Sequence, residues 1–189
     1  STTLSVTDAY DDHQLMYDCK APVSVEYFSM CNRLVSRNVF ERNVILPFEG
    51  VNMWDDVGLC TRVRFYTRGT AVINKGFYHY NRQNEQSTTR RPLLERAREQ
   101  ELCISCIEDF FRKEDSHDKY RLFLSYLRLV AAEDLFYYEP DIWRQKFEGL
   151  KDDLWKLRKL YTTKQLFKFY MLGCGGIIGK LVWKRFWKR

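Results

Sequence analysis

The sequence patterns that commonly mark an enzyme are missing from this 189-residue chain. The glycine-rich loops GxGxxG and GxxxxGK[ST], which cradle phosphates, do not occur, and neither do the zinc-protease motif HExxH and the serine-hydrolase motif GxSxG. Pairings such as Cys103 with His117 arise by chance in any chain of this size. We therefore expect no catalytic residue, no cofactor and no small-molecule substrate.

The cysteines and histidines also lack the spacing of a metal site. Cys103 and Cys106 form a CxxC pair, and the three histidines are scattered singly, whereas a structural zinc site needs a second pair or nearby histidines. The CxxC pair falls in the middle of a predicted helix, far from the helix N-terminus that activates redox thiols. Residues 1–25 hold no apolar stretch typical of a secretory signal, so we do not expect secretion or a disulfide framework. Reduced, mostly buried thiols and no metal ion are the prediction.

Acidic residues are absent from residues 161–189. This segment carries seven basic residues, whereas the other 160 residues carry 24 basic and 25 acidic ones, so the net charge of +6 is local to the C-terminus. Aromatic and basic residues flank an apolar, glycine-containing centre, which is typical of a helix whose middle lies in hydrocarbon and whose ends lie at lipid headgroups. Thr162 and Thr163 are the predicted caps of this terminal helix.

The length of the apolar centre leaves the type of membrane association open. Residues 169–179 are free of charge, but they are eleven residues and a bilayer core needs about 20 residues of helix. Residues 166–187 are long enough only if four cations extend their charged ends toward the headgroups. Gly175 and Gly179 make a GxxxG spacing that allows close approach of another helix, and the glycines also fit a hinge between two amphipathic helices. We expect a membrane-associated helix over 161–189 that spans, dips into or lies on the bilayer.

Two sets of residues in this terminal helix are candidate contacts. The residues expected to contact the membrane or a partner helix are Phe169, Gly175, Ile178, Gly179, Leu181, Val182, Trp183 and Trp187. The residues expected to contact anionic lipid headgroups are Lys164, Lys168, Lys184, Arg185, Lys188 and Arg189. The first set is apolar, aromatic or small and the second is cationic, as the centre and ends of such a helix require.

The chain is predicted to be mainly α-helical, with three to five helices in all. Residues 1–25 are polar and locally acidic, which predicts an extended arm that becomes ordered on a partner. Residues 26–160 form the predicted soluble domain, with a short helix over 26–40. Its segment 47–91 is irregular, and there the stretch CTRVRFYT alternates like a strand and predicts a short β-hairpin.

Three amphipathic helices follow in the sequence. Pro92 suits the first position of a helix over 92–113, with apolar residues on one face. A second helix is predicted over 116–138, before Pro140. Asp141 is the predicted cap of the third helix, in which apolar residues recur in steps of four and three, as in helix-on-helix packing.

This organisation is similar to that of the supernumerary subunits of mitochondrial inner-membrane assemblies, such as the respiratory complexes and ATP synthase. The resemblance implies a non-catalytic accessory subunit with a structural or assembly role, bound to other protein subunits and to the bilayer. One alternative is an RNA-associated scaffold such as an organellar ribosomal protein, whose basic tail neutralises phosphates. Another is a tail-anchored outer-membrane regulator whose helical bundle binds a partner helix. Apolar residues among the cations of the tail favour lipid over nucleic acid.

Overall fold

The computed structural model describes residues 6–19, 28–31, 33–67, 69–73, 92–138 and 140–174. Within these ranges the chain folds into seven α-helices, one short 3₁₀ helix and a two-stranded antiparallel sheet. The prediction of a mainly α-helical fold is confirmed. The described ranges already hold more helices than the three to five expected, because short helices precede the amphipathic ones.

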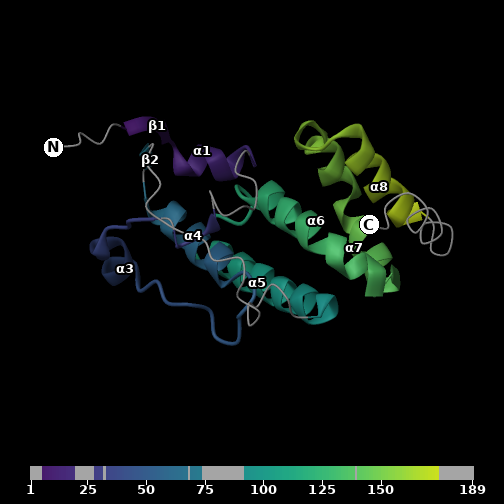
Figure 1. Cartoon of the computed structure of the whole chain (residues 1–189), viewed down its shortest axis with the longest axis horizontal. Coiled ribbons are helices and arrows are strands. Elements are labelled where there is room, and N and C mark those ends of the chain that lie inside the picture. Colours follow the sequence, from purple (N-terminus) through teal and green to yellow (C-terminus); the bar gives the residue numbers. More distant parts are fainter. Residues whose placement is uncertain are drawn as a thin grey trace.

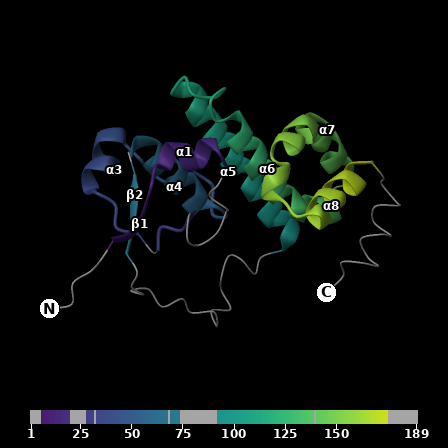
Figure 2. The ribbon, with the colours of Figure 1, turned by 90° about the horizontal axis from the view of Figure 1, so that it is seen from above.

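Four helices that follow one another in the sequence form the larger part of the fold. α5 (Leu93–Lys113) packs on α6 (Arg121–Tyr138), α6 packs on α7 (Pro140–Lys156), and α7 packs on α8 (Thr163–Cys174). The 3₁₀ helix η2 (Arg158–Leu160) joins α7 to α8. Each of these helices therefore contacts its neighbour in the chain, and α7 and α8 lie together at one end of the molecule (Figures 1 and 2).

The three amphipathic helices predicted from the sequence are present as α5, α6 and α7, with shifted boundaries. α6 begins five residues later than predicted, because residues 117–120 form turns. α7 begins at Pro140 itself, so Asp141 lies inside the helix and is not its cap. Proline is favoured at the first helical position, where its missing N–H removes no hydrogen bond.

The helix α4 (Asp55–Tyr66) occupies the stretch for which the sequence predicted a strand. Arg62 lies 3.8 Å over the ring of Phe48, and Arg64 pairs with the buried Asp12. Both arginines are buried, as is Val63 between them. The prediction of a hairpin here was wrong because α4 buries polar and apolar side chains alike, so its sequence lacks the apolar face that identifies a helix.

Of the predicted arm, residues 6–19 join the fold and do not extend away from it, whereas residues 1–5 and 20–25 lie outside the described residues. β1 (Val6–Tyr10) pairs antiparallel with β2 (Thr70–Ile73), which follows α4 in the chain. α1 (Asp12–Tyr17) packs against α4 and α6, and its Leu15 and Met16 are buried. This part of the predicted arm is therefore a strand at β1 and a helix at α1. The burial of Leu15 and Met16 attaches the otherwise polar segment to the core.

The helix α3 (Arg37–Asn43) lies at the opposite end of the molecule from α7 and α8 (Figures 1 and 2). None of its residues is buried, and the neighbouring aliphatic side chains Leu34, Val44 and Leu46 are exposed. α3 overlaps the helix predicted over 26–40 only in part. It ends at Val44, whose left-handed conformation (φ 50°) is unusual for a β-branched residue.

Side chains from α1, α4, α5, α6, α7 and α8 share one core. Aromatic pairs connect its parts: Phe111 of α5 stacks on Tyr120 with ring centroids 4.7 Å apart, and Phe28 stacks on Phe123 of α6 at 5.9 Å. Such pairs add specific geometry to the burial of large apolar surfaces. Because α8 contributes to this core, the first part of the basic C-terminal segment is held by the rest of the fold.

Candidate functional site

The last acidic residue of the chain is Asp153, close to the end of α7. The 36 residues that follow it carry ten basic residues and no acidic one. The basic segment therefore begins before residue 161, where the sequence analysis placed its start. Its first part is described by the structure, as the corner formed by the end of α7, η2 and the beginning of α8.

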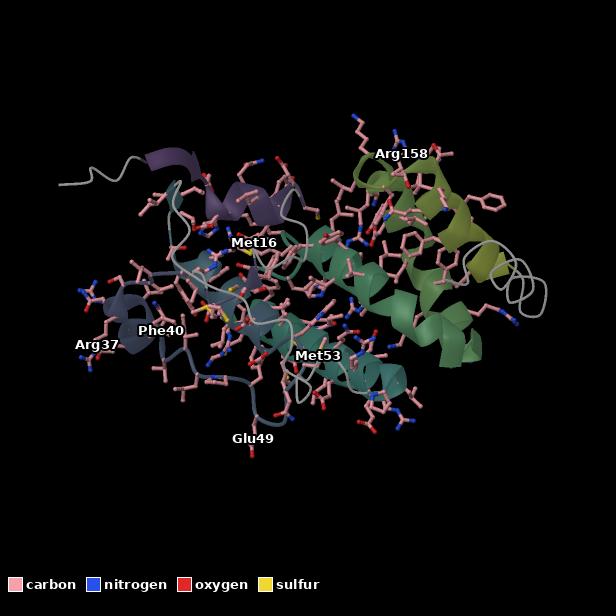
Figure 3. The ribbon with its side chains drawn as sticks, viewed as in Figure 1. Met16, Arg37, Phe40, Glu49, Met53 and Arg158 are labelled. Carbon is pink, nitrogen blue, oxygen red and sulfur yellow. The ribbon has the colours of Figure 1, made fainter. Side chains whose placement is uncertain are left out.

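Exposed apolar side chains lie among the cations of this corner. Trp155 exposes 60% of its surface, Phe167 51% and Leu160 39%. The Arg158 guanidinium lies 4.6 Å from the centroid of the Trp155 ring, a cation–π contact, and donates to the Trp155 carbonyl at 2.8 Å. Figure 3 shows Arg158 at the outer edge of the turn between α7 and α8. We call this surface the basic–aromatic face, and its members are Trp155, Lys156, Arg158, Lys159, Leu160, Lys164 and Phe167.

Aromatic contacts hold α8 against α7 and so position the face. Phe169 is 2% exposed and meets the ring of Tyr161 edge-on at 5.3 Å, while Tyr170 meets Phe147 edge-on at 6.0 Å. The sequence predicts Phe169 as a contact with the membrane or a partner helix. In the structure this ring contacts the chain's own core, and the exposed ring of α8 is Phe167, two positions earlier.

A capping box fixes the beginning of α8. The backbone N–H of Gln165 donates to Thr162 Oγ1 at 3.2 Å, and the backbone N–H of Thr162 donates to Gln165 Oε1 at 2.9 Å. These reciprocal bonds satisfy two donors that would otherwise lack a helical partner. The predicted cap at Thr162 is confirmed. The capping box therefore fixes the residue at which α8 begins.

Asp153 anchors the end of α7 to α6. Its buried carboxylate accepts hydrogen bonds from Ser125 Oγ at 2.7 Å and from Arg121 Nη1 at 3.0 Å, both on the same oxygen. Lys156 Nζ lies 3.5 Å from the other oxygen. Because a buried carboxylate is costly without such partners, these contacts fix the direction in which α7 leads into the basic–aromatic face.

The structure describes three of the predicted contact residues. Lys164 is exposed on α8, Lys168 lies within the same helix, and Phe169 lies in the core. The remaining predicted contacts, Gly175, Ile178, Gly179, Leu181, Val182, Trp183, Lys184, Arg185, Trp187, Lys188 and Arg189, lie outside the described residues. The exposed Trp155, Leu160 and Phe167 are not among the predicted contacts, although the run without acidic residues after Asp153 includes them.

A groove lies beside the basic–aromatic face. Its volume is about 510 Å³, and residues from the end of α1, the start of α6 and the turn from α7 into η2 line it. Its charged lining residues are Lys119, Arg121, Lys156, Lys159, Asp18 and Asp118. Because Lys156, Lys159 and Leu160 belong to both, the groove and the face are continuous.

A second polar cluster surrounds Glu108 of α5. Its carboxylate pairs with Arg112, Arg128 and His117, the last at 3.1 Å from Nε2. Burial alone would raise the pKa of Glu108, but the hydrogen bond from Arg112 and the charge of Arg128 outweigh it and lower the pKa from 4.5 to about 2. The contact with Arg128 joins α5 to α6, so this cluster belongs to the framework of the fold.

The lowered pKa of Glu108 predicts an acid-dependent loss of stability. The folded-state pKa lies below the unfolded value, so the ionised carboxylate stabilises the fold above pH 4.5 and this contribution is lost as the pH falls toward about 2. We expect the E108Q variant to lose less stability over that pH range than the unmodified chain, as measured by urea unfolding at each pH. Parallel losses in the two proteins would show that Glu108 does not contribute in this way.

The buried thiols lack the properties of reactive cysteines. Burial raises the pKa of Cys19 to about 12, that of Cys60 to about 11 and that of Cys103 to about 12. Cys103 is fully buried in α5, and its Sγ donates to the Trp54 carbonyl at 3.2 Å. Since the thiolate is the nucleophile, these groups pack as small apolar side chains, and the predicted core role of Cys103 is confirmed.

Thiol labelling tests this assignment. At pH 8 a thiol with a pKa of 12 is ionised in roughly one molecule in 10⁴, whereas Cys31 is exposed to the reagent. We expect a maleimide to modify Cys31 at least roughly 10²-fold faster than Cys103 in the folded protein, as measured by peptide mass spectrometry. Denaturant serves as the control and should remove the difference. Rapid labelling of Cys103 without denaturant would contradict the assignment.

Neither a membrane span nor a metal site is found in the part of the chain that the structure describes. No helix there combines the length and the hydropathy needed to cross a bilayer, so the C-terminal membrane helix predicted from the sequence is not confirmed. No group of three or more His, Cys, Asp or Glu side chains in the same ranges is placed to hold a metal ion.

Comparisons with family models, curated proteins and solved structures find no match to this chain. The features of the molecule that bear on its function are therefore the basic–aromatic face, the groove beside it and the helices that position them.

Proposed function

We propose that this chain is a non-catalytic accessory subunit of a membrane-bound protein assembly, held on the bilayer by its basic–aromatic face and the basic residues that follow. The observation that carries the proposal is the face itself. It combines four exposed cations with three exposed apolar side chains on one corner of a folded domain, in a segment without acidic residues. Lipid headgroups attract the cations, and the boundary between headgroups and acyl chains accommodates Trp, Leu and Phe.

The free energies expected for these contacts support attachment to the membrane surface. Each Lys or Arg close to an anionic membrane contributes about 1 kcal/mol, and this contribution falls within a Debye length. A single exposed apolar side chain adds too little for stable attachment, but the two kinds of contact act together on the same corner. Attachment in this form requires no helix that crosses the membrane.

The opposite end of the molecule supports the accessory role. Leu34, Val44 and Leu46 are exposed next to α3, a helix that buries none of its residues. Figure 3 places Arg37 of α3 at the far end of the molecule from Arg158. A domain with an exposed aliphatic end and a basic–aromatic end is suited to bind a protein subunit at the first and lipid at the second.

Nucleic acid is the alternative ligand for a basic surface with exposed rings. The exposed Leu160 and the apolar residues farther along the C-terminal segment favour lipid, because phosphates and bases give aliphatic side chains no partner. The mitochondrial inner membrane and the respiratory or ATP synthase type of assembly stay predictions, since they depend on the resemblance in organisation alone.

Flotation with vesicles tests the proposal. We expect the full chain to float with vesicles that contain phosphatidylserine and to stay in solution with phosphatidylcholine alone. Excess RNA should not compete. Failure to bind anionic vesicles, or displacement from them by stoichiometric RNA, would overturn the proposal.

A chain that ends at Cys174 separates the described face from the residues beyond it. This truncation keeps Phe169 in the core, whereas ending the chain at Tyr161 would remove that ring and disturb the fold. We expect the chain ending at Cys174 to retain weaker, salt-sensitive binding to anionic vesicles. Alkaline carbonate should release it from membranes, and comparison with the full chain then reports whether the last fifteen residues insert.

A further inference from the structure

The groove beside the basic–aromatic face has the charge and size of a site for a small anionic group. Four cationic and two acidic side chains line its volume of about 510 Å³, which falls in the range of about 300–1,000 Å³ typical of small-molecule sites. Such a volume is too small to enclose a partner helix with its side chains, whose diameter is about 10–12 Å.

Buried Asp153 organises two of the cations. Arg121 donates to its carboxylate at 3.0 Å, and Lys156 Nζ lies 3.5 Å from it. Arg121 and Lys156 remain half exposed at the groove while their positions are set by this buried group. Lys119, in the turn before α6, and Lys159, in η2, also line the groove and are exposed. The site is therefore partly organised before a ligand binds, which lowers the entropy lost on binding.

We infer that this groove binds the phosphomonoester headgroup of an anionic lipid. A phosphomonoester carries a charge of about −1.5 to −2 and three acceptor oxygens, which suits the four Lys and Arg side chains that line the groove. The positive end of the α6 dipole lies at the same place and adds to the attraction. Leu157 and Leu160 provide an apolar wall next to the cations, where the glycerol end of the lipid would lie.

The position of the groove favours a lipid over a free phosphate ester. Lys156, Lys159 and Leu160 belong both to the groove and to the basic–aromatic face, so a headgroup in the groove lies at the level of the proposed bilayer surface. The inference thus rests on the proposed function and adds to it a preference among anionic lipids. General attraction to negative charge gives no such preference.

The test compares two kinds of vesicle that have the same surface charge, one with phosphatidylinositol 4-phosphate and one with phosphatidylserine. We expect the full chain to bind the first about tenfold more tightly. The K119Q/K159Q variant should lose this preference, because both lysines line the groove. The K151Q/K164Q variant is the matched control: both lysines are exposed and neither lines the groove, so it should bind both vesicles more weakly and keep the preference.

The outcomes separate this inference from the proposed function. Equal binding of the unmodified chain to the two vesicles would overturn the headgroup site and leave membrane attachment in place, whereas absence of binding to either would overturn both. Inositol 1,4-bisphosphate in solution provides a second arm, read from the methyl signals of Leu122, Leu157 and Leu160 in NMR. If this compound shifts those signals but the vesicle preference is absent, the ligand is a soluble phosphate ester and the lipid assignment is wrong.

Discussion

Replacing Asp12 with alanine is expected to lower the free energy of unfolding by about 3–5 kcal/mol, because it removes the counter-charge that Asp12 supplies to the buried guanidinium of Arg64. The hydroxyl groups of Thr67 and Thr70 also donate to the carboxylate, at 2.9 Å and 3.0 Å. The cluster joins the start of α1 to the end of α4 and to β2. Its loss should therefore weaken the whole N-terminal part of the fold.

Urea unfolding followed by circular dichroism measures this loss. The control is the exposed pair of Arg37 and Glu41 on α3, four residues apart on one helix, for which E41A should cost about 0.5 kcal/mol or less. D12N keeps the size of the side chain while it removes the charge, and its stability should fall between those of D12A and the unmodified chain. A cost for D12A as small as that of E41A would show that the buried pair does not hold the N-terminal part in place.

The sequence predicts α5, α6 and α7 well because each of these helices buries one face. Along α7 and just past its end, the residues at steps of three and four, Phe147, Leu150, Leu154 and Leu157, are all buried. This period reports directly which side of a helix faces the core. The helix ends are less well predicted, because the turns over residues 117–120 depend on contacts between α5 and α6.

α4 and the N-terminal segment could not be predicted in the same way. The contacts that stabilise them join residues far apart in the chain: Asp12 and Arg64 are separated by 52 positions, and β1 pairs with β2 although α1, α3 and α4 lie between them in the sequence. In the local sequence, Arg62 and Arg64 alternate with apolar residues, a pattern that predicts a strand with both arginines facing solvent. Their partners, the Phe48 ring and the Asp12 carboxylate, appear only in the folded chain.

The sequence likewise predicts one part of the candidate site and not the other. A basic, aromatic C-terminal segment is a property of composition, so the sequence predicts it without knowledge of the fold. The burial of Phe169 and the exposure of Phe167 depend on how α8 lies on α7. The groove is a tertiary feature, since Lys119, in the turn before α6, and Lys159, in η2, are forty residues apart and both line it.

Replacing Arg158, Lys159 and Lys164 together with glutamine is expected to weaken binding to anionic vesicles roughly 10²-fold at low salt. Each cation near such a surface contributes about 1 kcal/mol, and about 1.4 kcal/mol corresponds to a factor of ten in the binding constant. All three side chains are exposed, so the fold should keep its stability. Flotation or tryptophan fluorescence over a series of lipid concentrations gives the constants.

The matched control removes three cations that lie outside the basic–aromatic face. R37Q, R42Q and R98Q, made together, change the net charge equally, and all three positions are exposed on α3 and α5. If the corner of α7, η2 and α8 faces the bilayer, this variant should bind within about threefold of the unmodified chain, because cations more than a Debye length from the surface are screened (about 10 Å at 0.1 M salt). Raising the salt to 1 M should reduce the difference between the variants, since the Debye length falls to about 3 Å. Equal weakening by the two triple variants would mean that net charge alone governs binding, and the basic–aromatic face would lose its role.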